Sequence, residues 1–423
     1  IIGNSIAEIS KFQGYKVIKI NYLGDWGTQF GKLIVGYKKW GSIDKLKKDS
    51  IRHLLSIYVK AGKTKSLDEK ARWEFKKLED GDKENTALWK LFRKLSMNNF
   101  EKIYEILNIK FNFIDGESNY NNKMDKIIEE LQKKTLLEES NGAQIVNLEK
   151  YGLGVCLIKK SDGATLYPTR DITAAIERHK KYKFDKMFYE VGSEQKLHFK
   201  QIFKVLELSG YSWAKNLSHI EHGLYLDKDG KKFSTRKGKT IFMSDILEEI
   251  EELAEKELKK RYKLSEKELE QRARIIARSA IFYGDLKNHR SNDIVYDIDR
   301  FISFEGDTGP YLLYSYARAR SILGKAKSSS KRAKVLNVND SEKQLILKLS
   351  QFPDVTAHAF KELSPNLIAN YAFQLSQNFN EFYQSSQVIG SDTEQFRLIL
   401  VDAFSQVLKN ALSLLGIDVI EKM

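Results

Sequence analysis

The hydrophobic pattern of the chain changes character near the middle of its 423 residues. Between residues 143 and 190 short β-rich runs recur at 144–146, 155–158 and 187–189, with a helical pattern at 170–181 between them. After a Gly/Lys-rich loop at 229–239 the pattern is almost wholly helical, as at 247–261, 266–283 and 396–415. Strands that alternate with helices predict a parallel sheet, and the helical run predicts a bundle. The predicted fold class is therefore α/β, with a parallel-sheet domain followed by an all-α bundle.

The first part of the chain also has helical and strand-like segments. Apolar residues at helical spacing from Ile2 to Phe12 precede Gly14, and residues 16–20 then alternate like a strand. Residues 32–110 are mostly helical and heavily charged, which indicates an insertion. The segment 193–208 has the spacing of an amphipathic helix, and Gly210 is the expected C-cap. The linker-like stretch at 328–332 is expected to be an exposed loop.

Charge and cysteine content restrict the partners and the compartment. Lys and Arg number 71 against 57 Asp and Glu, a formal net charge of +14 that is spread along the chain. This favours a polyanionic partner such as nucleic acid, although solubility alone is the alternative. The lone Cys156 excludes an internal disulfide and a cysteine-based zinc site, and indicates a reducing, cytoplasmic setting. No membrane span, secretory signal or metal-ligand spacing is found in the sequence, so we expect no membrane association and no protein-bound metal.

A cationic loop at 232–238 carries the strongest local signal. It reads Lys-Phe-Ser-Thr-Arg-Lys-Gly and follows Asp229-Gly230-Lys231. Fixed cations stabilise a pyrophosphate leaving group because it gains charge as its bond breaks. The alternative is a solvated basic hairpin. The loop is similar to the Lys-Met-Ser-Lys-Ser loop of class I aminoacyl-tRNA synthetases, in the Met-Ser-Thr-Arg-Lys-Gly form of the arginine enzymes. The resemblance implies catalytic roles for Lys232, Ser234 and Lys237, and ATP contacts from Phe233, Thr235, Arg236 and Gly238.

Two departures from the family pattern lie in this loop. Phe233 replaces the methionine, and Thr235 stands where many relatives have the second lysine. Lys232 or Lys237 would then have to supply that charge.

A second segment, 162–171, concerns the amino acid. Thr169 is a plausible N-cap, and Asp171 is expected in the first helical turn, where it could simply complement the helix dipole. Its pattern, Asp-Gly-x-x-x-Tyr-x-Thr-x-Asp, resembles the arginine-binding segment of arginyl-tRNA synthetases, which implies that Tyr167 and Asp171 contact arginine. By the same resemblance Glu117, in Asp115-Gly116-Glu117-Ser118, is a second carboxylate, and Gln195 is the substrate glutamine. A guanidinium requires such acidic and planar partners.

Further segments resemble the same family. The block 21–31 matches Asn-x-x-Gly-Asp-Trp-Gly-x-Gln-Phe-Gly, which in the family lies beside the active site, and individual roles within it stay open. The segment 304–320 resembles the opening of the helical anticodon-binding domain, and 415–423 resembles the shared C-terminus. Arginines and aromatic rings on one helix can contact phosphate and stack on bases. The resemblance therefore implies tRNA contacts from Tyr311, Arg318 and Met423.

The resemblance implies a complete domain plan and activity. It consists of a Rossmann-like catalytic domain at 1–245 with an insertion at about 32–142, a helical stem at 246–300 and an anticodon-binding domain at 301–423. The implied enzyme is a monomeric arginine–tRNA ligase that uses ATP with Mg²⁺ as substrate, forms arginyl-adenylate and transfers arginine to tRNA(Arg), activating arginine only with tRNA bound.

The start of the chain leaves an alternative open. The His-x-Gly-His element of class I synthetases is missing before Ile1, so we expect an N-terminally truncated chain that lacks part of its catalytic machinery. The alternative is a non-catalytic tRNA-binding module derived from a synthetase.

Overall fold

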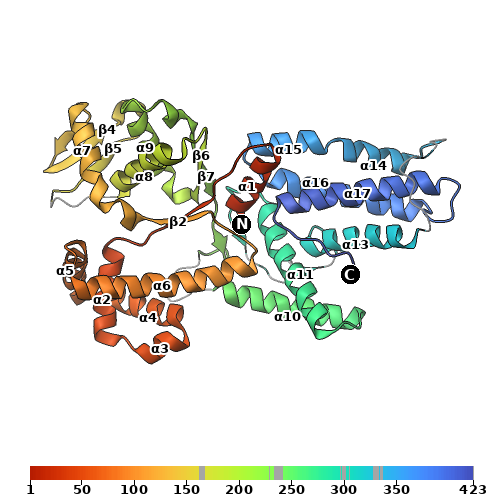
Figure 1. Cartoon of the computed structure of the whole chain (residues 1–423), viewed down its shortest axis with the longest axis horizontal. Helices are drawn as coiled ribbons and strands as arrows, with labels where there is room; N and C mark the ends of the chain where they lie inside the picture. Colours follow the sequence, from red (N-terminus) through yellow and green to blue (C-terminus); the bar gives the residue numbers. More distant parts are fainter. Residues whose placement is uncertain are drawn as a thin grey trace.

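The computed structural model describes residues 1–161, 167–227, 229–232, 242–295, 297, 302–303, 305–326, 333 and 337–422. The molecule is elongated, with most of the strands at one end and a helical bundle at the other (Figure 1). The N-terminus lies near the centre, where the two ends meet, and the C-terminus lies on the side of the bundle (Figure 1).

Two parallel strand pairs form the framework of the α/β half. Strand β1 (Ile20–Leu23) pairs with β2 (Phe113–Gly116), and β6 (Met187–Gly192) pairs with β7 (Leu217–His222). A parallel pair needs a long crossover. Helix α9 (Lys196–Leu208) and the 3₁₀ turn η5 (Ser212–Asn216) provide it for β6 and β7, and a helical insertion provides it for β1 and β2. This confirms the predicted α/β architecture with parallel strands.

The insertion between β1 and β2 is all-helical, as predicted for residues 32–110. It comprises α2 (Thr28–Trp40), α3 (Ile43–Lys48), α4 (Ser50–Lys63), the 3₁₀ turn η1 (Lys65–Leu67), α5 (Asp68–Glu79) and α6 (Lys83–Ile106). Its core packs Ile34, Phe75 and Phe92 against the buried Trp26. A Cβ on Gly31 would lie 2.0 Å from the carbonyl oxygen of Ala71, so only glycine permits this approach of α2 and α5.

A small antiparallel sheet corrects one expectation. After η2 (Glu117–Lys123) and α7 (Met124–Lys133), strands β3 (Glu138–Ser140), β4 (Ala143–Asn147) and β5 (Val155–Lys159) pair antiparallel. The β-rich runs at 144–146 and 155–158 are therefore strands, but the expectation that they belong to a parallel sheet is wrong. Residues 148–154, which include the turn η3 (Glu149–Tyr151), are too few for a parallel crossover.

Two local boundaries also differ from the sequence analysis. Helix α1 (Ile2–Phe12) has the predicted extent, but the following strand begins at Ile20 because pairing with β2 begins there, at Phe113. Helix α8 (Tyr167–Tyr182) begins earlier than expected. Thr169 is therefore not its N-cap but lies inside the helix, where its hydroxyl donates to the carbonyl oxygen of Ile158 at 2.6 Å. Asp171 consequently lies beyond the first turn.

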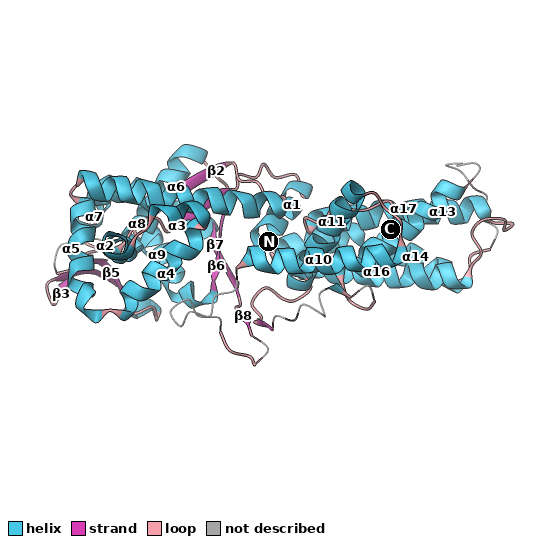
Figure 2. Cartoon of the chain, turned by 90° about the horizontal axis from the view of Figure 1, so that it is seen from below, coloured by secondary structure: helices cyan, strands magenta, loops and turns pink. Residues whose placement is uncertain are grey.

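The second half is helical, as predicted. A short pair, β8 (Tyr225–Leu226) with β9 (Ile294–Val295), brackets α10 (Met243–Arg261) and α11 (Glu266–Leu286). The bundle follows, with α13 (Gly309–Lys325), α14 (Asp340–Ser350), α15 (Phe352–Lys361), α16 (Asn366–Ser385) and α17 (Glu394–Leu414). Helices dominate this half, and the strands other than β8 and β9 lie in the other half (Figure 2). Among the described residues, none of these helices combines the length and apolarity that a bilayer crossing requires.

A continuous apolar core joins α1 to the bundle. The Phe379 and Phe404 rings stack with centroids 3.8 Å apart, and both side chains are fully buried. The hydroxyl of Ser5 in α1 donates to the carbonyl oxygen of Leu414 in α17 at 2.8 Å. The N-terminal helix of the α/β half is thus anchored on the helical half, which fixes the position of the loop that leads into β1.

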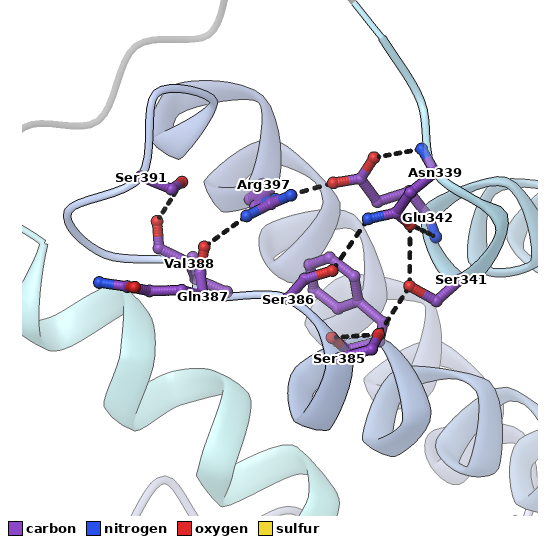
Figure 3. A network of polar contacts seen from close by, with 10 residues as sticks. Asn339, Ser341, Glu342, Ser385, Ser386, Gln387, Val388, Ser391 and Arg397 are labelled. Carbon is purple, nitrogen blue, oxygen red and sulfur yellow. Dashed lines mark hydrogen bonds and ion pairs between the residues drawn. The ribbon is translucent and has the colours of Figure 1, made fainter.

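A polar network closes the far end of the bundle (Figure 3). Glu342, only 1% exposed, accepts from Nε of Arg397 at 2.7 Å, and Nη1 of Arg397 donates to the carbonyl oxygen of Gln387 at 2.6 Å. Asn339 and Glu342 form a capping box at the start of α14, and Asn339 also donates to Ser386. The network therefore ties the ends of α14, α16 and α17 together. Replacing either charge would leave the other buried and uncompensated.

Candidate active site

A cavity of about 1180 Å³ lies between the two parallel strand pairs, with residues of both β1 and β6 in its wall. The sequence-predicted residues Glu117, Tyr167, Asp171 and Gln195 all line it. They come from segments far apart in the sequence. Glu117 begins η2 directly after β2, Tyr167 and Asp171 lie on α8, and Gln195 ends η4 (Ser193–Gln195) between β6 and α9.

The position of these residues follows from the topology. Strands β2 and β6 end at Gly116 and Gly192, immediately before Glu117 and the turn that carries Gln195. In open α/β structures, ligands bind beyond the carboxyl ends of parallel strands, because there the loops from neighbouring strands converge. The cavity therefore has the location of a substrate site.

Glu117 is a largely buried carboxyl in the cavity wall. It is 12% exposed and accepts from Nη1 of Arg170 at 3.2 Å. Burial raises the pKa of Glu117 to about 7, because the ionised carboxylate loses hydration; Asp171 and Asp25 add to the rise, while Arg170 opposes it. A second cation that reached this carboxylate would favour its ionised form.

Asp171 has a single described partner in the cavity wall. Nε2 of His198 lies 2.7 Å from Oδ2 of Asp171, and both side chains are mostly buried. His198 lies one helical turn after Gln195, so α8 and α9 present their polar residues to the same space. Tyr167 is 43% exposed, and its hydroxyl donates to Oε1 of Gln29 at 3.3 Å. The block at 21–31 thus reaches the same cavity.

The cationic loop is described only at its start. Nζ of Lys232 pairs with Oε1 of Glu194 at 2.7 Å, and Glu194 lines the cavity. This ion pair lowers the pKa of Glu194. Phe233, Ser234, Thr235, Arg236, Lys237 and Gly238 lie outside the described residues. Lys232, the first residue of the loop, therefore lies beside the cavity. Its partner Glu194 belongs to η4, the same turn that carries Gln195.

A second polar cluster lies on the helical half. Asn380 of α16 donates to the hydroxyl of Tyr311 at 2.8 Å and accepts from Nη1 of Arg318 at 2.6 Å. The Arg318 guanidinium lies 4.7 Å from the ring centroid of Tyr314 and 5.1 Å from that of Tyr383, which is 42% exposed. The predicted residues Tyr311 and Arg318 are thus joined through Asn380. Met423 lies outside the described residues.

Several residues of both clusters were not predicted from the sequence. His198 and Arg170 contact Asp171 and Glu117, and Asn380 connects the predicted Tyr311 and Arg318. The only local signals were the position of His198 one helical turn after Gln195 and that of Arg170 beside Asp171. Nothing local marked Asn380, because its partners lie more than 60 residues away in the chain.

The chain has a domain with parallel strands followed by a helical domain. This is the architecture of a class I synthetase, and the comparisons with known families agree with it. The family model "tRNA synthetases class I (R), catalytic domain" matches residues 1–298, and "DALR anticodon binding domain" matches residues 312–423. The chain is therefore organised as a class I aminoacyl-tRNA synthetase.

Individual relatives show which class I synthetase family the chain belongs to. The arginine–tRNA ligase of Clostridium perfringens is 46% identical over 433 residues, which cover 100% of this chain and 76% of the relative. That of Clostridium beijerinckii is 45% identical over 431 residues with the same coverage. The chain belongs to the arginyl-tRNA synthetase family.

Solved structures agree with this fold. Arginyl-tRNA synthetase from Plasmodium falciparum superposes with a TM-score of 0.85 at 26% identity, covering 100% of this chain and 73% of that one. The Thermus thermophilus arginyl-tRNA synthetase gives a TM-score of 0.87 at 22% identity, covering 100% and 78% respectively, and supports the fold alone. Membership of the family makes arginine, ATP and tRNA(Arg) the substrates of the reaction that these enzymes catalyse.

Proposed function

We propose that Glu117, Tyr167, Asp171 and Gln195 form the arginine-binding site of this arginine–tRNA ligase. The observation that carries the proposal is their common cavity at the carboxyl ends of parallel strands. The two carboxylates supply negative charge for the guanidinium, whose fixed N–H groups need several acceptors. The hydroxyl of Tyr167 and the amide of Gln195 then orient the amino acid.

The proposed reaction needs no covalent enzyme intermediate. A carboxylate oxygen of arginine attacks the α-phosphorus of ATP, the bond to the β-phosphate oxygen breaks, and pyrophosphate leaves. A ribose hydroxyl at the 3′ end of tRNA then attacks the arginyl carbonyl, so that an ester forms and AMP leaves. Mg²⁺ enters with ATP as part of the substrate. Catalysis rests on positioning and electrostatic stabilisation.

The cationic loop is the proposed source of that stabilisation. Lys232, Ser234 and Lys237 would act on the phosphates, and Phe233, Thr235, Arg236 and Gly238 would close over ATP. The ion pair of Lys232 with Glu194 supports this because it brings the start of the loop to the cavity wall. Breaking this exposed pair costs little, so Lys232 is free to turn toward a phosphate when ATP enters.

The helical half is the proposed tRNA-binding part. Tyr311, Arg318 and Met423 would contact tRNA(Arg), with Arg318 on phosphate and the aromatic rings on bases. We further propose the domain limits 1–245, 246–300 and 301–423, a monomeric and cytoplasmic enzyme, and activation of arginine only when tRNA is bound. The single cysteine and the basic charge are compatible with these proposals.

Arginine binding to this chain tests the proposed site. We expect Asp171→Asn to raise the Kd for arginine at least tenfold in isothermal titration calorimetry, because a buried charged hydrogen bond contributes about 1.5–3 kcal/mol. Affinity for citrulline, whose side chain is uncharged, should change little. Asp185→Asn is the matched control, because Asp185 is an exposed carboxylate that lines the same cavity. Equal arginine affinity in the Asp171 variant and the wild type would contradict the proposed site.

The same titration separates the enzyme from a tRNA-binding module without catalysis. A ligase must bind arginine, whereas such a module binds tRNA alone. Tight tRNA binding without arginine binding, together with no tRNA-dependent ATP–pyrophosphate exchange, would favour the module.

A further inference from the structure

Asp25 lies where the helical insertion meets the cavity, in the loop between β1 and α2. It is only 4% exposed, although it carries a charge. Its neighbour Trp26 points into the core of the insertion, where it packs edge-on against Phe75 and Trp89 with centroids 5.7 and 5.6 Å apart. Both adjacent residues therefore contact the insertion, and Asp25 also contacts Ser118 at the start of η2. A buried carboxylate is costly unless its oxygens are hydrogen-bonded.

The oxygens of Asp25 are bound from two directions. From η2, next to the cavity-lining Glu117, the backbone N–H of Ser118 donates to Oδ1 at 2.9 Å and the hydroxyl of Ser118 donates to Oδ2 at 2.9 Å. From the insertion, Nε of Arg93 on α6 donates to Oδ2 at 2.8 Å, and the indole N–H of Trp89 donates to the backbone carbonyl oxygen of Asp25 at 2.7 Å. Asp25 thus links α6 to the first residues of η2.

This link acts on Glu117 through its immediate neighbours. A Cβ on Gly116 would lie 2.3 Å from Oδ2 of Asp25, so the turn is packed directly against the carboxylate. Ser118 is held by both of its donors on the other side of Glu117. A side chain flanked by two fixed residues has little freedom to move away from the cavity.

We propose that Asp25 is a positioning residue for arginine recognition, and that Arg93 and Trp89 make the helical insertion part of the arginine site. The inference rests on the proposed function, because it requires Glu117 to contact arginine. Arg93 does not line the cavity, so any effect of its substitution on arginine affinity must pass through Asp25. The insertion would then influence arginine affinity without touching the amino acid.

Arg93→Met tests this link, since methionine keeps the length of the side chain and removes the charge and the donors. We expect a roughly tenfold weaker Kd for arginine, because the turn loses one charged anchor. The Kd for ATP should change less than twofold. Arg93→Lys should restore most of the arginine affinity, because an ammonium can still reach the carboxylate. If Asp25 had a purely structural role, Arg93→Met would weaken the binding of arginine and of ATP by similar factors.

Glu74→Gln is the matched control within the insertion. Glu74 is buried and bonded to Asn85 and Lys38, with no described contact to Asp25, so its loss loosens the insertion itself. Arginine affinity should stay within twofold of the wild type in this variant. If Glu74→Gln weakened arginine binding as much as Arg93→Met does, a general loosening of the insertion would explain the effect and the proposal would be wrong.

Two further variants keep the result decisive. Ser118→Ala removes one hydroxyl donor and leaves the backbone bond intact, so it should raise the Kd for arginine about threefold. This variant tests the link even if Arg93→Met fails to fold. Glu117→Gln reports on the arginine site itself. If Glu117→Gln leaves arginine binding intact, the proposed function fails. If it weakens binding while the folded Ser118 and Arg93 variants bind arginine normally, only the role of Asp25 fails.

Discussion

Replacing Glu117 by glutamine is expected to stabilise the protein at pH 8 while weakening arginine binding. The wild-type carboxyl has its pKa raised from 4.5 to about 7, chiefly by burial. At about 1.36 kcal/mol for each pH unit between 4.5 and about 7, ionising the carboxyl in the folded chain costs roughly 3 kcal/mol more than in the unfolded chain. With the side chain only 12% exposed, solvent screens little of this cost.

The sign follows from proton binding in the two states. Below about pH 4.5 the carboxyl is protonated in both the folded and the unfolded chain, so ionisation costs nothing. As the pH rises toward 7, the unfolded chain ionises first while the folded chain retains the proton, and stability falls. Above pH 7 the whole cost of roughly 3 kcal/mol is present, whereas at pH 5 less than about 1 kcal/mol of it is. Glutamine resembles the protonated form and avoids this loss.

Urea unfolding followed by circular dichroism measures the difference. We expect the free energies of unfolding of Glu117→Gln and wild type to be similar at pH 5 and to separate at pH 8, with the variant higher by up to roughly 3 kcal/mol. Saturating arginine should raise the stability of the wild type and leave the variant nearly unchanged. Glu194→Gln is the control, because this exposed carboxylate has a lowered pKa and should give no gain at pH 8. A variant less stable than wild type at pH 8 would refute the assignment of a raised pKa to Glu117.

Three other substitutions test packing, the polar network and the tRNA surface. Gly31→Ala should destabilise the insertion by about 3 kcal/mol, measured by urea unfolding, because the added methyl meets the carbonyl of Ala71. Arg397→Met should cost about 3–5 kcal/mol in the same assay, since Glu342 would be left buried without its partner. Arg318→Ala should weaken tRNA binding about tenfold in filter binding and reduce its salt dependence, and an unchanged salt slope would count against a phosphate contact.

Several features of the fold and the site could not be predicted from the sequence because they depend on which distant segments meet. The antiparallel β3–β4–β5 sheet was mistaken for part of a parallel one because periodicity identifies a strand but not its partner. Thr169 looked like an N-cap because its residue type suits one, yet α8 begins earlier and gives its hydroxyl a partner in β5. His198, Arg170 and Asn380 were missed because their contacts join segments that the sequence separates by 27 to 69 residues.

The sequence by itself determined the helical and strand segments, the insertion and the family motifs. Local patterns contain this information because each segment must place its apolar residues on one side. Only the tertiary structure decided that the motif residues share one cavity, that burial raises the pKa of Glu117, and that Asp25 joins the insertion to the site. Burial, charge interactions and hydrogen bonds depend on which distant segments meet, and long-range packing alone sets those distances.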